Sequence, residues 1–112
     1  WTLFGCGGNR DKSKRNKMFK IAKQYSQKIF ITSDNSRFEN FNSIVKDILG
    51  EDRFDNLEVI KDRDSAIKIA IDTLPKNVPL LILGRGHEET LSLGKNIINH
   101  SDIKAVQRYI SL

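Results

Sequence analysis

Leu80-Leu81-Ile82-Leu83-Gly84-Arg85-Gly86-His87-Glu88 is the stretch that decides the fold of this chain. Its first four residues form a short apolar run after Pro79, which predicts a strand buried on both faces and therefore a parallel sheet. The two glycines allow the backbone to turn sharply and to approach a ligand closely. Parallel α/β sheets bind ligands at the carboxyl ends of their strands. Residues 84–88 are thus a candidate site, although a turn with solvated charges explains this segment equally well.

The rest of the chain alternates between two apolar patterns. Short runs rich in β-branched and aromatic residues predict strands at 2–4, 28–32 and 57–60. Between them, apolar residues at three- and four-residue steps predict helices. The helical stripes are Met18, Ile21, Ala22 and Tyr25, then Phe41, Ile44, Val45, Ile48 and Leu49, then Ala66, Ile67, Ala70, Ile71 and Leu74.

After the decisive stretch, two short segments around Gly94 predict a hairpin. Ser101 or Asp102 is expected to cap a last helix, whose predicted apolar stripe is Ile103, Val106, Gln107 and Ile110. Strands that alternate with helices predict right-handed βαβ units. We therefore expect residues 1–112 to form a single α/β domain, a three-layer Rossmann-like fold with a mainly parallel sheet and a small C-terminal hairpin.

Composition narrows the class of protein. The chain has 38% apolar and 29% charged residues, as a globular domain does, and no apolar run approaches the ~20 residues that cross a membrane. One cysteine, Cys6, leaves no internal disulfide and favours a reducing compartment. The net charge of +5 favours anionic partners. Basic residues crowd into positions 10–23, where a solvated helix face beside a phosphate is favoured over a nucleic-acid stripe.

Three loops are expected to meet at one edge of the sheet, because they follow the carboxyl ends of the first, second and fourth strands. They contain Phe4-Gly5-Cys6-Gly7-Gly8-Asn9-Arg10-Asp11-Lys12-Ser13-Lys14-Arg15, then Thr32-Ser33-Asp34-Asn35-Ser36-Arg37 with Glu39, then the glycine turn 84–88. These stretches resemble the F-G-C-G-G-x-R-D-x-x-K-R, T-x-D-N-P-R-x-E and G-K-G-H-E motifs of the Mur ligases. The resemblance runs from Phe4 to the last helix. Two positions depart from the motifs, Ser36 in place of proline and Arg85 in place of lysine.

The resemblance implies the C-terminal domain of the Mur ligase that adds the third amino acid to a peptidoglycan precursor in the bacterial cytoplasm. Such an enzyme activates the glutamate carboxylate of UDP-N-acetylmuramoyl-L-Ala-D-Glu with ATP and joins it to an incoming amine. ATP and Mg²⁺ are then bound mainly by a central ATPase domain, and UDP by an N-terminal domain, both expected upstream of this chain. No G-x-x-x-x-G-K-[ST] motif occurs here. The isolated domain is expected to be inactive.

The resemblance also implies residue roles. Arg10 and Asn35 hold the carboxylate beside the attacking amine, and Arg37 takes a second, distal carboxylate with paired hydrogen bonds. Glu88 and the Gly84 carbonyl receive the distal ammonium. The residues with the remaining implied roles are Asp34, which orients Arg37, and Lys12, Lys14 and Arg15, which approach the ATP phosphates or form a solvated start to the helix.

A distal carboxylate is present in diaminopimelate and absent from lysine. We therefore predict meso-diaminopimelate, or an analogue such as lanthionine, as the amino acid. The alternative for Arg37 is a surface ion pair with Glu39 or Asp34. Cys6 is expected to be packed rather than nucleophilic, and His87 to be a structural hydrogen-bonding residue; no metal site is expected, because His100 alone is not enough.

Two other functions compete with this reading. The first is another amide ligase of the superfamily, either a different Mur ligase or a folylpolyglutamate synthase. The second belongs to another class, a stand-alone Rossmann-like module that binds nucleotide or RNA, which predicts retention on nucleic acid with a steep dependence on salt. The ligase reading predicts no partner nucleic acid and no membrane.

Overall fold

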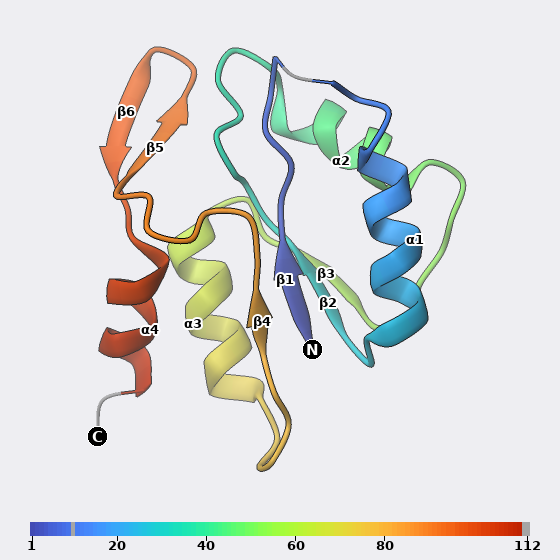
Figure 1. Ribbon diagram of the computed structural model, residues 1–112, viewed down its shortest axis with the longest axis vertical. Helices are drawn as coiled ribbons and strands as arrows, with labels where there is room; N and C mark the ends of the chain where they lie inside the picture. Colours follow the sequence, from blue (N-terminus) through green and yellow to red (C-terminus); the bar gives the residue numbers. More distant parts are fainter. Residues whose placement is uncertain (10, 111–112) are drawn as a thin grey trace.

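The structure, a computed structural model, describes residues 1–9 and 11–110 (Figure 1). Its elements are β1 (Thr2–Phe4), α1 (Arg15–Tyr25), β2 (Ile29–Ile31), α2 (Phe41–Leu49), β3 (Leu57–Val59), α3 (Arg63–Thr73), β4 (Leu81–Ile82), β5 (Thr90–Leu93), β6 (Asn96–Asn99) and α4 (Asp102–Ile110). The predicted α/β class and the hairpin after the fourth strand are confirmed. Predicted and observed bounds differ only at the ends of elements, where apolar pattern and hydrogen bonding seldom coincide.

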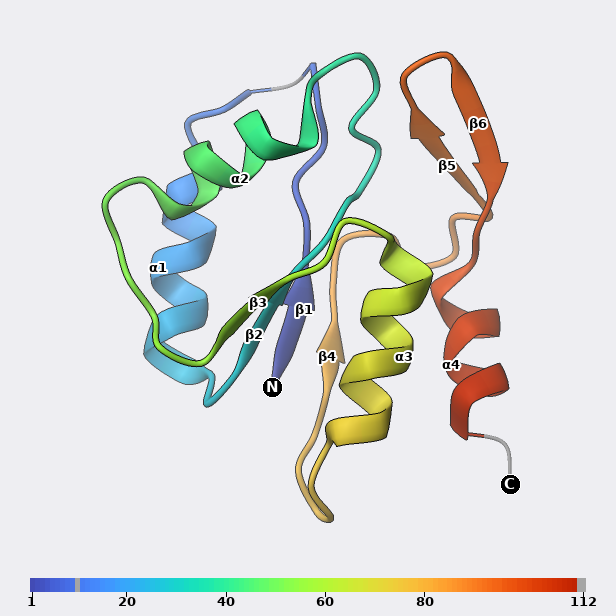
Figure 2. The same cartoon turned by 180° about the vertical axis from the view of Figure 1, so that it is seen from behind.

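Four strands form a parallel sheet in the order β3-β2-β1-β4, and β5 and β6 form a separate antiparallel hairpin (Figures 1 and 2). Because successive strand residues face opposite sides, each strand supplies two cores. Phe4 packs with side chains of α1 and α2, whereas its neighbour Leu3 packs with side chains of α3 and α4. The sheet is therefore the middle of three layers.

The edge strand β4 corrects one prediction. Leu80 and Ile82 pack against the α3–α4 core, but Leu81 and Leu83 on the other side are 55% and 44% exposed. Helices α1 and α2 pack on β1 and β2 on that side, which leaves β4 uncovered. The prediction of a strand buried on both faces is wrong, because an apolar run does not reveal how far the covering helices reach.

Helix α1 corrects a second prediction. Its core residue is Phe19, which is fully buried, whereas three members of the predicted stripe face outward: Met18, Ile21 and Tyr25, the last 78% exposed. These side chains line an apolar groove of about 310 Å³ together with Leu81 and Leu83. The apolar spacing therefore predicts the helix correctly, but most of the predicted stripe faces the part of the sheet that α1 and α2 leave uncovered.

The buried face of α4 also differs from the predicted stripe. Asp102 and Ala105 are buried, while Ile103 and Ile110 are exposed. The cause is Arg63 of α3, whose Nε and Nη2 donate to the two oxygens of Asp102 at 2.8 Å. Because of this pair, Asp102 rather than Ile103 lies in the contact between α3 and α4. Ser101 caps the helix by accepting from the N–H of Lys104.

Two glycines bring the loops at the upper edge of the sheet together. The N–H of Gly8 donates to the Asn35 carbonyl at 2.8 Å, and a Cβ at Gly8 would lie 1.8 Å from the Ser36 carbonyl oxygen. Gly84 has a φ of +107°, which side chains with a Cβ rarely adopt. Backbone contact at Gly8 and the turn at Gly84 place the three predicted loops at one edge.

Candidate functional site

The loops after β1, β2 and β4 enclose a cavity of about 340 Å³, here named the edge cavity. The parallel strands end on the same side, so their following loops converge there, as the sequence predicts (Figure 1). The predicted site residues that line the edge cavity are Lys14, Arg15, Asp34, Asn35, Arg37, Gly84 and Glu88. Arg10 lies outside the described residues.

Arg37 is the cation of the edge cavity. Its Nη1 donates to the carbonyl oxygens of Gly8 and Asn35, both at 3.0 Å. Its backbone has a φ of +54° and its N–H donates to the Ser92 carbonyl of the hairpin. Among residues 1–9 and 11–110, no carboxylate forms an ion pair with Arg37, so the surface pairing weighed as the alternative is not found. Arg37 is therefore a half-buried guanidinium that has no acidic partner in this part of the chain, and such a group can bind an anion.

Glu88 supplies an anion to the same cavity. Its Oε2 accepts from Asn35 Nδ2 at 3.2 Å and lies 3.5 Å from Nη1 of Arg85. The Asn35 side chain also accepts from the Ser92 N–H at 2.9 Å, so one amide links the hairpin to Glu88. The second oxygen of Glu88 has no hydrogen bond within the described part of the chain. It is available to an ammonium group.

Asp34 corrects a predicted contact. Its Oδ1 accepts from the Asn35 N–H at 2.8 Å and lies 3.8 Å from Nη1 of Arg85. No hydrogen bond joins it to Arg37, whose Nη1 is held by backbone carbonyls instead. Burial raises the pKa of Asp34, although the Asn35 N–H and the nearby guanidinium groups of Arg63 and Arg85 oppose the rise. Asp34 thus contacts Arg85, the residue that stands in place of the motif's lysine, and not Arg37.

Arg15 corrects another prediction, because it is not free to meet phosphates. The side chain is buried, and it donates to Glu39 at 2.7 and 2.9 Å, to Asp47 at 2.8 Å and to the Gly7 carbonyl at 2.9 Å. These hydrogen bonds lower the pKa of Glu39 to about 2. Arg15 therefore ties the first loop to the second loop and to α2. Among the predicted phosphate contacts, Lys12 and Lys14 are exposed.

The remaining singled-out residues have structural explanations. Cys6 is buried beside Met18, and burial raises its thiol pKa to about 11, which fits a packed and unreactive side chain. His87 is exposed and has no side-chain hydrogen bond among the described residues, so its predicted structural role is wrong. Within the same residues, no group of three potential ligands could hold a metal ion, and no helix is long and apolar enough to cross a membrane.

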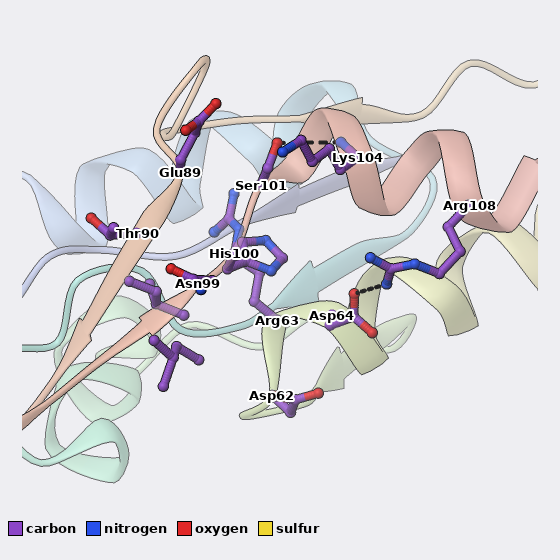
Figure 3. A pocket seen from close by; sticks show the side chains of 12 residues that line it. Asp62, Arg63, Asp64, Glu89, Thr90, Asn99, His100, Ser101, Lys104 and Arg108 are labelled. Carbon is purple, nitrogen blue, oxygen red and sulfur yellow. Dashed lines mark hydrogen bonds and ion pairs between the residues drawn. The ribbon is translucent and has the colours of Figure 1, made fainter.

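Sequence reasoning missed the buried charges behind the edge cavity. Arg63 and Arg85 are buried, and both lie near Asp102. A second cavity of about 600 Å³ opens between the hairpin and the starts of α3 and α4 (Figure 3). Its arginines are paired within the protein, Arg108 with Asp64 at 3.0 Å and Arg63 with Asp102 at 2.8 Å. The smaller edge cavity, with its unmatched guanidinium, is therefore the better candidate site.

Comparisons with known proteins agree on one family. Residues 1–86 match the family model described as Mur ligase, glutamate ligase domain. The UDP-N-acetylmuramoyl-L-alanyl-D-glutamate--2,6-diaminopimelate ligase of Blochmanniella floridana is 45% identical over 103 residues, which cover 91% of this chain and 21% of that protein. The ligase of the same name from Helicobacter hepaticus is 44% identical over 110 residues, with 97% and 24% coverage.

A solved structure of a ligase with this name superposes with a TM-score of 0.93 at 31% identity. The match covers 98% of this chain and 23% of that chain. This chain therefore spans about a fifth of the length of the first-named relative.

Proposed function

This chain belongs to the Mur ligase family, and from that membership and the edge cavity we propose that it is the C-terminal, amino-acid-binding domain of a cytoplasmic UDP-N-acetylmuramoyl-tripeptide synthetase (MurE). The full-length protein activates the glutamate carboxylate of UDP-N-acetylmuramoyl-L-Ala-D-Glu with ATP. It then joins that carboxylate to the amine of an incoming amino acid in peptidoglycan synthesis. This domain holds that amino acid.

The observation that carries the proposal is that Arg37 and Glu88 line the same cavity without forming an ion pair with each other. A guanidinium without an acidic partner selects a carboxylate, and a carboxylate with one free oxygen selects an ammonium. An amino acid with charged groups at both ends, such as meso-diaminopimelate, satisfies both. Lysine leaves Arg37 short of a partner, at a cost of ~1–3 kcal/mol for a buried group. The relatives' names, which include 2,6-diaminopimelate, support the same choice.

The roles are those that the family resemblance implies, and they leave the attacking amine free and uncharged. Arg37 binds the distal carboxylate, and Glu88 with the Gly84 carbonyl binds the distal ammonium. Asn35, which has one amide hydrogen left beyond its bond to Glu88, binds the carboxylate beside the attacking amine together with Arg10. Asp34 positions this group of residues through Arg85.

ATP and Mg²⁺ are assigned mainly to other parts of the full-length protein. The chain lacks a phosphate-binding G-x-x-x-x-G-K-[ST] motif, and its described residues include no metal-ligating cluster. Lys12 and Lys14 are the residues of this domain proposed to approach the phosphates when the domains close. Closure brings amine and carboxylate together, and proximity of this kind can supply ~7–11 kcal/mol of a reaction barrier.

The test is a substrate panel with the full-length protein, comprising meso-diaminopimelate, lanthionine and L-lysine. We expect diaminopimelate to be joined and lysine to be used at least about tenfold less efficiently, as the loss of one buried ionic partner predicts. Arg37→Met should remove this preference. Arg53→Met, at an exposed arginine outside the cavity, is the control and should leave it intact.

Two results would contradict the proposal. The first is equal use of lysine and diaminopimelate by the unmodified protein, with no effect of Arg37→Met. The second is absence of amide-bond formation together with salt-dependent retention on RNA, which would favour the nucleic-acid-binding alternative.

A further inference from the structure

Arg63, in the first turn of α3, reaches two loops of the edge cavity from behind. Its guanidinium is fully buried. Nη1 donates to the Ser33 carbonyl at 3.1 Å, and Nη2 donates to the Leu83 carbonyl at 3.0 Å. Ser33 directly precedes Asp34, and Leu83 directly precedes Gly84. One rigid, planar group therefore holds a carbonyl near the start of each of the two loops that follow β2 and β4.

The sheet itself does not join these two loops. They follow β2 and β4, and β1 lies between those strands in the order β3-β2-β1-β4. Consequently no ladder hydrogen bond runs from β2 to β4. The side-chain link between Asn35 and Glu88, at 3.2 Å, lies at the exposed mouth of the cavity. Arg85 of the third loop also lies 3.8 Å from Asp34 of the second. Arg63 is the buried residue that hydrogen-bonds to the backbone of both loops, and as a bridge between them it can fix their separation.

Asp102 fixes the orientation of that bridge. Its two oxygens accept from Nε and Nη2 of Arg63, both at 2.8 Å, and Oδ1 also lies 2.7 Å from Nε2 of His100. Figure 3 shows Arg63 and His100 side by side. A further buried guanidinium, that of Arg85, donates to the His100 carbonyl at 2.9 Å and to the Thr90 carbonyl at 2.8 Å. Asp102 thus anchors the bridge to α4 and, through His100, to the end of the hairpin.

We propose that Arg63, oriented by Asp102, is a positioning residue for the amino-acid site. It sets the separation between the Asn35 side and the Glu88 side of the edge cavity, and so the fit of an amino acid that is charged at both ends. Arg63 does not touch this amino acid. The inference rests on the proposed function, and it adds a specificity role that comes from behind the cavity.

The experiment compares Arg63→Lys and Asp102→Asn in the full-length protein with Arg108→Gln as the matched control. Arg108 also joins α4 to α3, through Asp64, but it bonds to neither loop. A lysine ammonium cannot span both carbonyls and Asp102 in one plane. We expect Arg63→Lys to raise KM for diaminopimelate about tenfold or more, since small misplacements cost up to ~100-fold. KM for ATP should stay within about twofold, and Asp102→Asn should act in the same direction but less strongly.

A second readout does not depend on turnover. Amide hydrogen exchange in Arg63→Lys should accelerate in residues 33–37 and 84–88 while the rest of α3 stays protected. The control variant should leave both KM and exchange unchanged.

Three outcomes would overturn the proposal. One is an unchanged KM for diaminopimelate in a folded Arg63→Lys protein. Another is an equal rise in all KM values with exchange spread over α3, which would mean that Arg63 serves the fold as a whole. Loss of folding in both variants would lead to the same conclusion; if only Arg63→Lys fails to fold, Asp102→Asn decides. Failure of the proposed function looks different, because the unmodified protein then does not join diaminopimelate at all.

Discussion

Arg15 and Arg37 both line the edge cavity, but their charged groups have different partners. Arg15 is buried between two carboxylates, Glu39 and Asp47, at 2.7 and 2.8 Å. Arg37 bonds only to backbone carbonyls among the described residues, although Glu39 is two positions away in sequence. The charge of Arg15 is thus neutralised by two carboxylates, whereas Arg37 has no carboxylate partner among the described residues.

The carboxylates show the same division. Hydrogen bonds from Arg15 lower the pKa of Glu39 to about 2. Burial acts to raise the pKa of Asp102, but hydrogen bonds from Arg63 and His100 outweigh it and hold that pKa well below its usual range. In contrast, burial raises the pKa of Asp34, beside the edge cavity. Glu39 and Asp102 are thus stabilised as anions in the folded chain, whereas Asp34, which lines the edge cavity, is not.

The largest effect should come from breaking the scaffold at Asp102. Asp102→Ala leaves the fully buried Arg63 without its carboxylate, and removing one partner of a buried pair costs ~3–5 kcal/mol. The free energy of unfolding in urea measures this loss. Asp72→Ala, which breaks an exposed pair with Lys68, is the control and should cost far less. Similar losses in the two variants would show that the buried pair is not a special part of the scaffold.

The sequence was sufficient to predict the layers and the converging loops. It was not sufficient to predict which parts of the sheet the helices cover. Apolar spacing identified α1, yet it could not show that Met18, Ile21 and Tyr25 face a part of the sheet that no described helix covers. In the same way, the sequence could not show that Leu81 in β4 and Leu83 just after it are exposed. Periodicity reports which residues share a face, and coverage of that face depends on tertiary packing.

For the site, the sequence motifs named residues that do share a cavity. They did not separate Arg15 from Arg37, because the acids that neutralise Arg15 lie 24 and 32 positions along the chain. Arg63 was missed for a related reason, since its carboxylate partner is 39 positions away in α4. The only sequence signal was an acid, Asp102, at the start of a helix, where capping explains it as well.

A smaller effect is expected from pH. The pKa of Glu39 falls from its ordinary value of 4.5 to about 2 in the folded chain, so its stabilising contribution is present above pH 4.5 and is lost as the pH falls toward 2. The free energy of unfolding should therefore decline over this range, and Glu39→Gln should make the decline shallower. Urea titrations at several pH values measure the slope. An unchanged slope would mean that the pairing with Arg15 does not favour the charged form.

The smallest change in stability is expected on replacing Asp34, and its sign should be opposite to that at Asp102. A raised pKa in the folded chain means that ionised Asp34 opposes folding at pH 7, and that this cost disappears as the pH falls below the unfolded pKa. Asp34→Asn keeps the oxygen that accepts from the Asn35 N–H, so we expect equal stability or a gain of up to ~1 kcal/mol at pH 7. The difference from the unmodified chain should vanish near pH 3.

Asp55→Asn, at an exposed aspartate, is the control and should change stability little at either pH. A clear loss at pH 7 for Asp34→Asn would reverse the assignment, because attraction to Arg63 and Arg85 would then exceed the cost of burial. A gain in stability together with weaker binding of diaminopimelate would mean that Asp34, like Arg37, serves ligand binding. Both residues would then carry charge that serves a ligand rather than the fold.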